Sequence, residues 1–152
     1  MIVPVNVKKL HPEAITPKYA TDGAACFDLH VCEPCTDPRV MGGIDGSTIA
    51  ATFNTGLAFE IPRGWVMLVF SRSGHGFNHD VRLANCVGVI DSDYRGEVKV
   101  RLAADTIRSL TVKHGDRIAQ AMVLPIYTVD LIDADTLSVS ERGEGGFGST
   151  GA

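Results

Sequence analysis

The segment CVGVIDSDYRGEVKVR, residues 86–101, places two carboxylates and one tyrosine between two apolar runs. Alternating runs of this length predict strands, so Asp91, Asp93 and Tyr94 are expected at the end of a hairpin. A carboxylate at such an end can activate a water molecule or contact metal-bound water. The alternative is that both aspartates only shape the turn, because Asp is a frequent turn residue.

The segment SRSGHG, residues 71–76, follows an apolar run and carries an arginine and a hydroxyl among glycines. The Arg72 guanidinium, the Ser73 hydroxyl and the backbone amides around Gly74 could together bind phosphate oxygens. A surface loop without a ligand is the alternative for this segment. By itself, the segment GDRIAQ at residues 115–120 indicates only a turn that leads into a strand.

The end of the chain, RGEGGFGSTGA, has five glycines between residues 142 and 152. Glycine loses more backbone entropy on ordering than any other residue, so this tail should be mobile unless a ligand or neighbour holds it. Gly143, Gly145 and Gly148 have GxGxxG spacing, but no βαβ pattern surrounds them and the Walker A residues are missing. One arginine, one aromatic ring, two hydroxyls and several amides remain, and such groups contact phosphates and bases.

Four cysteines are present, Cys26, Cys32, Cys35 and Cys86. The N-terminus lacks the basic start and apolar run of a signal peptide, which predicts a soluble cytoplasmic protein with reduced thiols. Cys32 and Cys35 form a CxxC near His30, but a structural zinc site needs four ligands and no second CxxC or HxxxH follows. Two thiols without a metal are therefore favoured over a zinc site.

A chain of 152 residues with 45% hydrophobic and 21% charged residues fits one globular domain. Its formal charge of -4 and the lack of a basic block disfavour nucleic-acid binding. No apolar run is long enough to predict a membrane span. Short alternating runs between turn residues predict an all-β barrel or sandwich with room for one short helix. The expected strands cover residues 3–7, 55–61, 65–70, 87–91, 98–102, 110–112 and 118–126.

Five segments, taken in order, resemble the five ordered motifs of the trimeric dUTPase family. They are YATDGAACFDL at 19–29, SRSG at 71–74, GVIDSDYRG at 88–96, GDRIAQ at 115–120 and RGEGGFGSTG at 142–151. The resemblance spans nearly the whole chain, and five motifs in order are far more specific than any one of them. It implies a jelly-roll-like β-barrel over residues 1–141. A flexible glycine-rich arm over residues 142–152 would close over the active site of the same domain.

The resemblance also implies an activity, the hydrolysis of dUTP to dUMP and pyrophosphate, which removes dUTP and supplies dUMP for thymidylate synthesis. Asp91 would activate the water that attacks the α-phosphorus, and Tyr94 would pack against the deoxyribose and exclude a ribose hydroxyl. The hairpin backbone would read the edge of uracil and leave no room for the methyl group of thymine. The hairpin residues assigned to substrate binding are Asn85, Gly88, Val89, Ile90, Asp93 and Tyr94.

The resemblance assigns the remaining substrate contacts to residues outside the hairpin. Phosphate contacts fall to Arg72, Ser73, Gly74, Gln120, Arg142, Ser149 and Thr150, and Phe147 with Gly148 would cover the uracil ring. Mg2+ would be chelated mainly by the triphosphate, with Asp28 acting through a metal-bound water. The family further implies a homotrimer whose sites each take Asp91 from one subunit and the arm from another. Ser71 and Cys26 stand where the family often has proline and glycine, which affects fine geometry and none of the assigned chemical groups.

Two other functions compete with dUTP hydrolysis. The first is a dCTP deaminase of the same fold, which would attack the base and rely on a catalytic glutamate near it. The second is a nucleotide-sensing regulatory protein with poor turnover. The sequence IDSDY and the complete glycine-rich arm favour hydrolysis over both, because deamination does not use this aspartate and a pure sensor needs no base.

Overall fold

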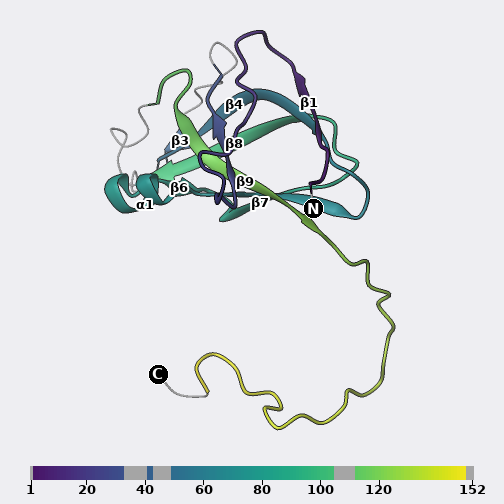
Figure 1. Ribbon diagram of the computed structural model, residues 1–152. Coiled ribbons are helices and arrows are strands. Elements are labelled where there is room, and N and C mark those ends of the chain that lie inside the picture. Colours follow the sequence, from purple (N-terminus) through teal and green to yellow (C-terminus); the bar gives the residue numbers. More distant parts are fainter. Residues whose placement is uncertain (1, 33–40, 43–48, 105–111, 150–152) are drawn as a thin grey trace.

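The structure is a computed structural model that describes residues 2–32, 41–42, 49–104 and 112–149 (Figure 1). Cys35, Thr150 and most of the strand expected at residues 110–112 lie outside these ranges. The elements in chain order are β1 (Asn6–Lys9), β2 (Phe27–His30), β3 (Met41–Gly42), β4 (Ile49–Glu60), β5 (Trp65–Phe70), α1 (Ser73–His79), β6 (Arg82–Leu83), β7 (Val87–Ile90), β8 (Glu97–Ala104) and β9 (Arg117–Pro125). The predicted all-β class is confirmed.

The strands form two antiparallel sheets. One sheet has the order β1-β4-β8-β6, with β3 also paired to β4, and the other has the order β2-β9-β5-β7. Strands that are neighbours in a sheet are mostly distant in sequence, so each sheet is assembled from chain crossings and not from successive hairpins. This arrangement brings the first four motif segments to the edges and ends of a few strands.

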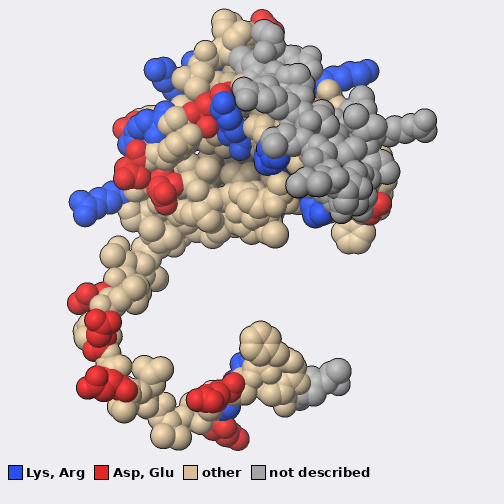
Figure 2. Space-filling model, turned by 180° about the vertical axis from the view of Figure 1, so that it is seen from behind, with Lys and Arg blue, Asp and Glu red and all other residues tan. Residues whose placement is uncertain are grey.

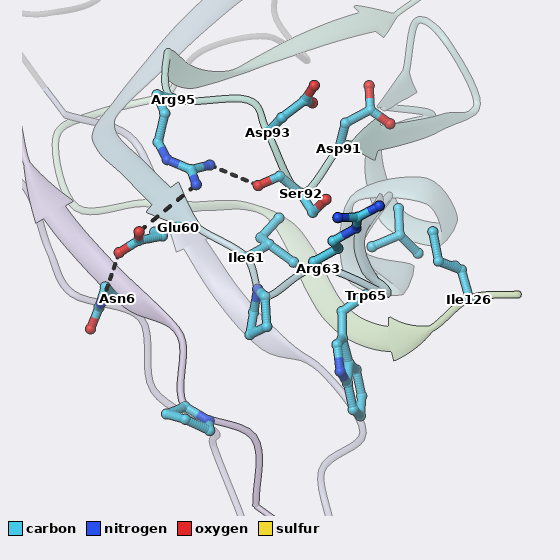
Figure 3. Close-up of a pocket in the computed structure, with 13 residues that line it drawn as sticks. Asn6, Glu60, Ile61, Arg63, Trp65, Asp91, Ser92, Asp93, Arg95 and Ile126 are labelled. Atoms are coloured by element: carbon cyan, nitrogen blue, oxygen red, sulfur yellow. Dashed lines mark hydrogen bonds and ion pairs between the residues drawn. The ribbon is translucent and has the colours of Figure 1, made fainter. Parts of the chain in front are cut away.

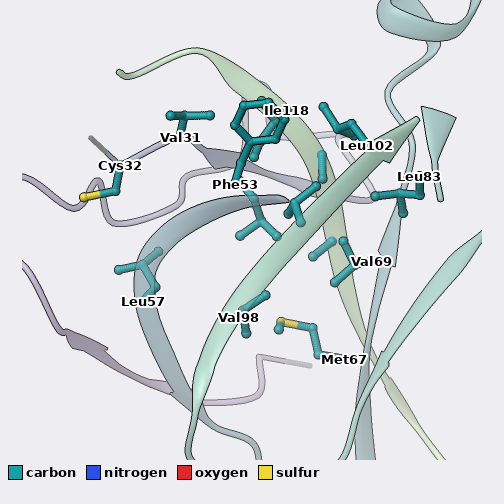
Figure 4. Packing of buried hydrophobic residues seen from close by; sticks show 14 of the residues in the cluster. Val31, Cys32, Phe53, Leu57, Met67, Val69, Leu83, Val98, Leu102 and Ile118 are labelled. Atoms are coloured by element: carbon teal, nitrogen blue, oxygen red, sulfur yellow. The ribbon is translucent and has the colours of Figure 1, made fainter. Parts of the chain in front are cut away.

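Alternation of side chains builds the core between the sheets. In β8 the burial pattern alternates, with Val98, Val100 and Leu102 each 1% exposed and the residues between them facing outward. Figure 4 shows Val98 of β8 close to Met67 of β5, which comes from the other sheet. Burying an aliphatic side chain of this size contributes about 1.5 to 3 kcal/mol. The β5, β8 and β9 segments were predicted from this alternation.

A bend in β4 depends on one buried hydroxyl and one glycine. The Thr55 hydroxyl donates a hydrogen bond to the Val98 carbonyl at 2.7 Å, where the β4–β8 register shifts. Gly56 has a φ of 67°, and a Cβ there would lie 2.9 Å from Ala14 Cβ and from Cys32 Sγ. Any larger residue would therefore be strained in backbone and crowded in side chain, so this position requires glycine.

Two sequence-based expectations about local structure were wrong. Residues 71–76 were expected to form a loop, but α1 begins within them at Ser73. The strands on either side of SDYRG were expected to form a hairpin, but β7 pairs with β5 while β8 pairs with β4 and β6. The turn between them therefore crosses from one sheet to the other. The alternation of apolar residues within a strand does not indicate which sheet that strand joins.

The chain leaves the barrel at Pro125, the last residue of β9. Residues 126–149 run away from the sheets as an extended tail (Figures 1 and 2). The tail exposes apolar side chains by 69% to 101%, namely Tyr127, Val129, Leu131, Ile132, Leu137 and Val139. The domain boundary predicted between residues 141 and 142 stays a prediction. Among the described residues, no helix is long and apolar enough to cross a membrane.

Candidate active site

The turn that carries Asp91 lies at the end of β7. Asp91 is exposed, and its carbonyl accepts a hydrogen bond from the Tyr94 amide at 3.2 Å, which closes the turn. Residues 91–96 are called the Asp91 turn below. Asp93 is also exposed here, so both carboxylates predicted at this strand end are at the surface.

Tyr94 is held over the start of β8. Its hydroxyl donates a hydrogen bond to the Glu97 carbonyl at 3.0 Å, and the residue remains 44% exposed. A Cβ on Gly96 would collide with the Tyr94 ring and hydroxyl. Gly96 therefore makes room for the ring, and the exposed part of Tyr94 is available to a ligand.

Two adjoining cavities lie between β7 and β8 and form what we call the β7–β8 groove. The first, of about 280 Å³, is lined by Val89, Ile90, Asp91, Tyr94, Glu97, Val98 and Lys99. The second, of about 250 Å³, is lined by Val69, Leu83, Asn85, Gly88, Val89, Ile90, Lys99 and Arg101. Because β7 pairs with β5 on its other side, its remaining backbone edge faces this groove. A flat ring with polar edges fits such a slot.

Gly88 and Asn85 shape the second cavity. A Cβ on Gly88 would lie 3.1 Å from Val69 Cβ and 3.9 Å from Asn85 Nδ2. Glycine therefore keeps the groove floor flat, and the Asn85 amide lies next to it. The structure thus brings six predicted site residues together around one groove: Asn85, Gly88, Val89, Ile90, Asp91 and Tyr94.

A second group of polar residues, called the Asp28 cluster, consists of Asp28, Arg72, His75, Arg117 and Gln120. Arg72 Nε donates to Asp28 Oδ1 at 2.9 Å, and an Arg117 guanidinium nitrogen donates to Asp28 Oδ2 at 3.2 Å. Gln120 Nε2 donates to the Ser71 carbonyl at 2.9 Å. The Asp28 side chain is only 16% exposed, and each of its oxygens accepts a hydrogen bond from one arginine.

Sequence reasoning missed two members of this cluster, Arg117 and His75. Arg117 lies within the GDRIAQ motif, and its place in that motif was the signal that could have identified it. His75 has no such signal, because its role depends on α1 bringing its ring to the Arg117 carbonyl, 2.9 Å away. Burial lowers the pKa of His75 below its ordinary value, and the neighbouring Arg72 acts in the same direction. Ser73 and Gly74 are the first two residues of α1.

The strand register places the Asp91 turn far from the Asp28 cluster within one chain. Asp28 pairs with Gln120, Gln120 with Phe70 and Phe70 with Val87, so these residues form one row across the sheet. Asp91 lies four residues beyond Val87, and β7 and β2 are at opposite ends of the strand order. With about 4.8 Å between strands and about 3.3 Å per residue, Asp28 and Asp91 are roughly 20 Å apart.

The predicted residues of the tail lie away from both groups (Figure 1). Phe147 is fully exposed with a φ of 51°, and Arg142 Nε donates to the Gly145 carbonyl at 2.7 Å. Ser149 is exposed as well. The tail of one chain therefore does not contact the Asp91 turn or the Asp28 cluster of the same chain in this conformation.

Comparisons with known proteins give the family. A profile of the dUTPase family matches residues 12–151. The deoxyuridine 5'-triphosphate nucleotidohydrolase of Nautilia profundicola is 43% identical, over 97% of this chain and 98% of its own length. That of Helicobacter hepaticus is 42% identical, over 97% of this chain and 88% of its own length.

A solved structure supports the same conclusion. The Staphylococcus bacteriophage 80alpha dUTPase with dUpNHpp superposes with a TM-score of 0.78 at 26% identity, covering 98% of this chain and 99% of the phage protein. This likeness confirms the predicted jelly-roll-like β fold. Neither the deaminase nor the sensor alternative is supported by these relatives. The chain belongs to the dUTPase family.

Proposed function

We propose that this protein hydrolyses dUTP to dUMP and pyrophosphate, which removes dUTP and supplies dUMP for thymidylate synthesis. The observation that carries the proposal is the position of Asp91, an exposed carboxylate at the mouth of the β7–β8 groove in a chain of the dUTPase family. A base bound in the groove would bring its sugar to Tyr94 and its α-phosphate to Asp91.

In the proposed reaction, Asp91 acts as the general base. Its carboxylate accepts a proton from a water molecule as the water oxygen forms a bond to the α-phosphorus. The bond between the α-phosphorus and the bridging oxygen breaks, and pyrophosphate leaves with the bond electrons. Removing the proton as the bond forms is the kind of assistance that typically gives about 100-fold to 10,000-fold in rate.

Selection of the nucleotide would take place in the β7–β8 groove. The β7 backbone edge that faces the groove and the Asn85 amide offer hydrogen-bonding groups for the edge of uracil, and Gly88 has no side chain that would fill the slot. Tyr94, fixed by Glu97 and Gly96, would leave no room for a ribose 2'-hydroxyl. A polar edge match rejects wrong bases more strongly than apolar shape does.

The Asp28 cluster would bind the phosphates and the metal. Arg72 and Gln120, with Ser73 and Gly74 at the start of α1, supply donors for phosphate oxygens. Mg2+, when bound, would neutralise phosphate charge and align the α-phosphorus for attack.

The residues present fit a metal that arrives with the nucleotide. The described residues hold no group of three or more His, Cys, Asp or Glu side chains suited to a metal ion. One carboxylate, Asp28, fits a contact through metal-bound water. We therefore expect calorimetry to find weak Mg2+ binding to the free protein and tight binding only with nucleotide.

The active enzyme is proposed to be a homotrimer with shared sites. A general base must reach its water, and through it the phosphorus, within about 3 Å. Asp91 and Asp28 are roughly 20 Å apart in one chain by strand geometry, so one triphosphate cannot engage both in the same subunit. A second subunit would supply the missing group. The exposed apolar tail also needs a neighbouring surface to cover it.

The activity is tested by measuring pyrophosphate release with dUTP, dTTP, dCTP and UTP under the same conditions with Mg2+. Release with dUTP, and little with the other three, is the expected result. Ammonia release from dCTP without pyrophosphate would identify a deaminase, and nucleotide binding without turnover would identify a sensor. Either of these outcomes would refute the proposed activity.

Site sharing is tested by coexpressing full-length Asp91→Asn chains with chains truncated before Arg142, each inactive alone. In mixed trimers, some sites would take Asp91 from a truncated chain and the arm from a full-length chain, so activity should return. The control pairs full-length Asp91→Asn chains with truncated Asp91→Asn chains, in which no site can be complete. If mixed trimers form but remain as inactive as this control, the arm serves its own subunit.

A further inference from the structure

A network of side chains connects the Asp91 turn to the neighbouring strands β4 and β1. The turn borders a hollow of about 860 Å³, and Figure 3 shows Arg95, Glu60 and Asn6 along one side of it. We propose that Arg95 is a positioning residue that holds the backbone of the turn so that Asp91 keeps its catalytic direction. Glu60 and Asn6 orient Arg95. This inference rests on the proposed role of Asp91 as the general base.

Arg95 bridges two carbonyls of the turn with one guanidinium nitrogen. That nitrogen donates to the Ser92 carbonyl at 2.8 Å and to the Tyr94 carbonyl at 3.0 Å. These two carbonyls flank Asp93, which is two residues beyond Asp91. Hydrogen bonds from a charged donor are stronger than neutral ones, so the bridge fixes the path of the backbone immediately after Asp91.

The other side of the guanidinium faces the end of β4. A second Arg95 nitrogen lies 3.8 Å from Glu60 Oε1, and the other Glu60 oxygen accepts a hydrogen bond from Asn6 Nδ2 at 2.7 Å. Asn6 of β1 and Glu60 of β4 are also direct partners in the strand register. The network therefore links the turn to a paired and rigid part of the first sheet.

The turn needs such support because it crosses between sheets. Strands on either side of it belong to different sheets, so no ladder between them fixes its shape. Asp91 and Arg95 are both exposed, and packing contributes little to their positions. A displacement of about 1 Å in a catalytic group can reduce the rate about 100-fold, so a turn held by directed hydrogen bonds has a clear catalytic value.

The contacts in the network should contribute unequally to holding the Asp91 turn in place. The Arg95–Glu60 pair is long, and its side chains are 53% and 55% exposed, so solvent screens it strongly. The two bonds from Arg95 to the turn carbonyls are shorter and local. Loss of Arg95 should therefore lower kcat more than loss of Glu60 does, and Glu60 should affect kcat only through Arg95.

The main test measures kcat for dUTP and the affinity for dUpNHpp in Arg95→Ala, with Mg2+ present in both assays. We expect kcat to fall about 10-fold to 100-fold while the affinity changes no more than about 3-fold, because the turn remains but its catalytic group is misdirected. Arg95→Lys should recover part of the lost kcat, since it keeps the charge but lacks the planar fork. If Arg95→Ala does not fold, Arg95→Lys alone carries the test, with a smaller loss of kcat and unchanged affinity.

A double-mutant cycle tests whether Glu60 acts through Arg95. Glu60→Gln should lower kcat about 2-fold to 5-fold in the wild type and have no further effect in Arg95→Ala. Independent, multiplying losses would show that Glu60 does not act through Arg95 and would overturn that part of the proposal. The matched control is Arg63→Ala, which removes an exposed arginine that lines the same hollow. Its kcat should equal that of the wild type.

Asp91→Asn, measured beside these variants, separates this inference from the function on which it rests. An inactive Asp91→Asn with a fully active Arg95→Ala would refute only the positioning role. A fully active Asp91→Asn would refute the assignment of the base itself. Parallel losses of affinity, melting temperature and kcat in Arg95→Ala would show a general structural role and would also overturn the inference.

Discussion

The Asp91 turn and the Asp28 cluster both present a carboxylate, but they hold it in opposite ways. Asp28 is mostly buried, and both of its oxygens accept hydrogen bonds from arginines. Asp91 is exposed, and the contacts around it hold the backbone of its turn. The first arrangement suits a fixed group among cations, where phosphates and a metal can be received. The second leaves a carboxylate available to accept a proton.

The two regions also depend differently on the rest of the fold. Pairing of β2, β9 and β5 brings the Asp28 cluster together within one sheet. The Asp91 turn joins the two sheets and is supported from the side by Arg95. A site divided in this manner lets each half be changed without disturbing the other, and the predictions below use that independence.

The largest effect is expected from Asp91→Asn. Asparagine keeps the size of the side chain but cannot take the proton from water, so kcat should fall about 100-fold to 10,000-fold. Affinity for dUpNHpp should stay near that of the wild type, because Asp28, Arg72 and Gln120 are unchanged. Quenched-flow measurement of pyrophosphate release checks the first statement and calorimetry the second. Near-normal turnover in the folded variant would remove Asp91 from the mechanism.

Much of the Asp91 turn could be predicted from the sequence, because its signals are local. Alternating residues predicted the flanking strands, and the Asp, Tyr and Gly of SDYRG predicted the turn itself. The assignment of β7 and β8 to different sheets could not be predicted, because pairing partners depend on residues far along the chain. The groove between them is a product of that pairing.

Less of the Asp28 cluster could be predicted without the family resemblance. Its members come from three separate segments, and tertiary folding brings them together. β2 was not predicted, although its sequence FDLH alternates between apolar and polar residues. α1 was not located either, because its seven residues include two glycines and none of them is buried. Consequently His75 had no sequence signal, because its contact with the Arg117 carbonyl forms only when α1 packs beside the start of β9 in the folded chain.

The next largest effect is expected in the Asp28 cluster, from Arg72→Gln. Losing a hydrogen bond to a charged group costs about 1.5 to 3 kcal/mol, so affinity for dUpNHpp should weaken about 10-fold to 100-fold. Affinity for dUMP should change little, because dUMP would contact mainly the β7–β8 groove. Calorimetry with both ligands makes the comparison. Equal weakening of the affinities for the two ligands would show that Arg72 does not bind the phosphates that dUMP lacks.

A smaller effect is expected from the tail, which lies away from both regions in the structure. Phe147 is fully exposed, and stacking of a base on an aromatic ring is worth about 1 to 3 kcal/mol. Phe147→Trp should therefore change fluorescence when dUpNHpp is added to the assembled protein. Since Trp65 also emits, the wild type, which carries Trp65 as its single tryptophan, supplies the background. An emission that does not respond beyond this background would mean that the tail does not close over the base.

The smallest effect is expected from His75→Gln, and it concerns stability as a function of pH. Burial lowers the pKa of His75 in the folded protein, whereas the unfolded chain has the ordinary value of about 6.5. The unfolded state therefore takes up a proton first as pH falls, and stability that is present above about pH 6.5 is lost below it. The melting temperature of the wild type should thus decrease more between neutral and mildly acidic pH than that of His75→Gln. Glutamine can still donate to the Arg117 carbonyl without gaining a proton. Asn78→Gln, an exposed neutral position on the same helix, should keep the wild-type slope, and equal slopes for all three proteins would exclude His75 as a source of acid sensitivity.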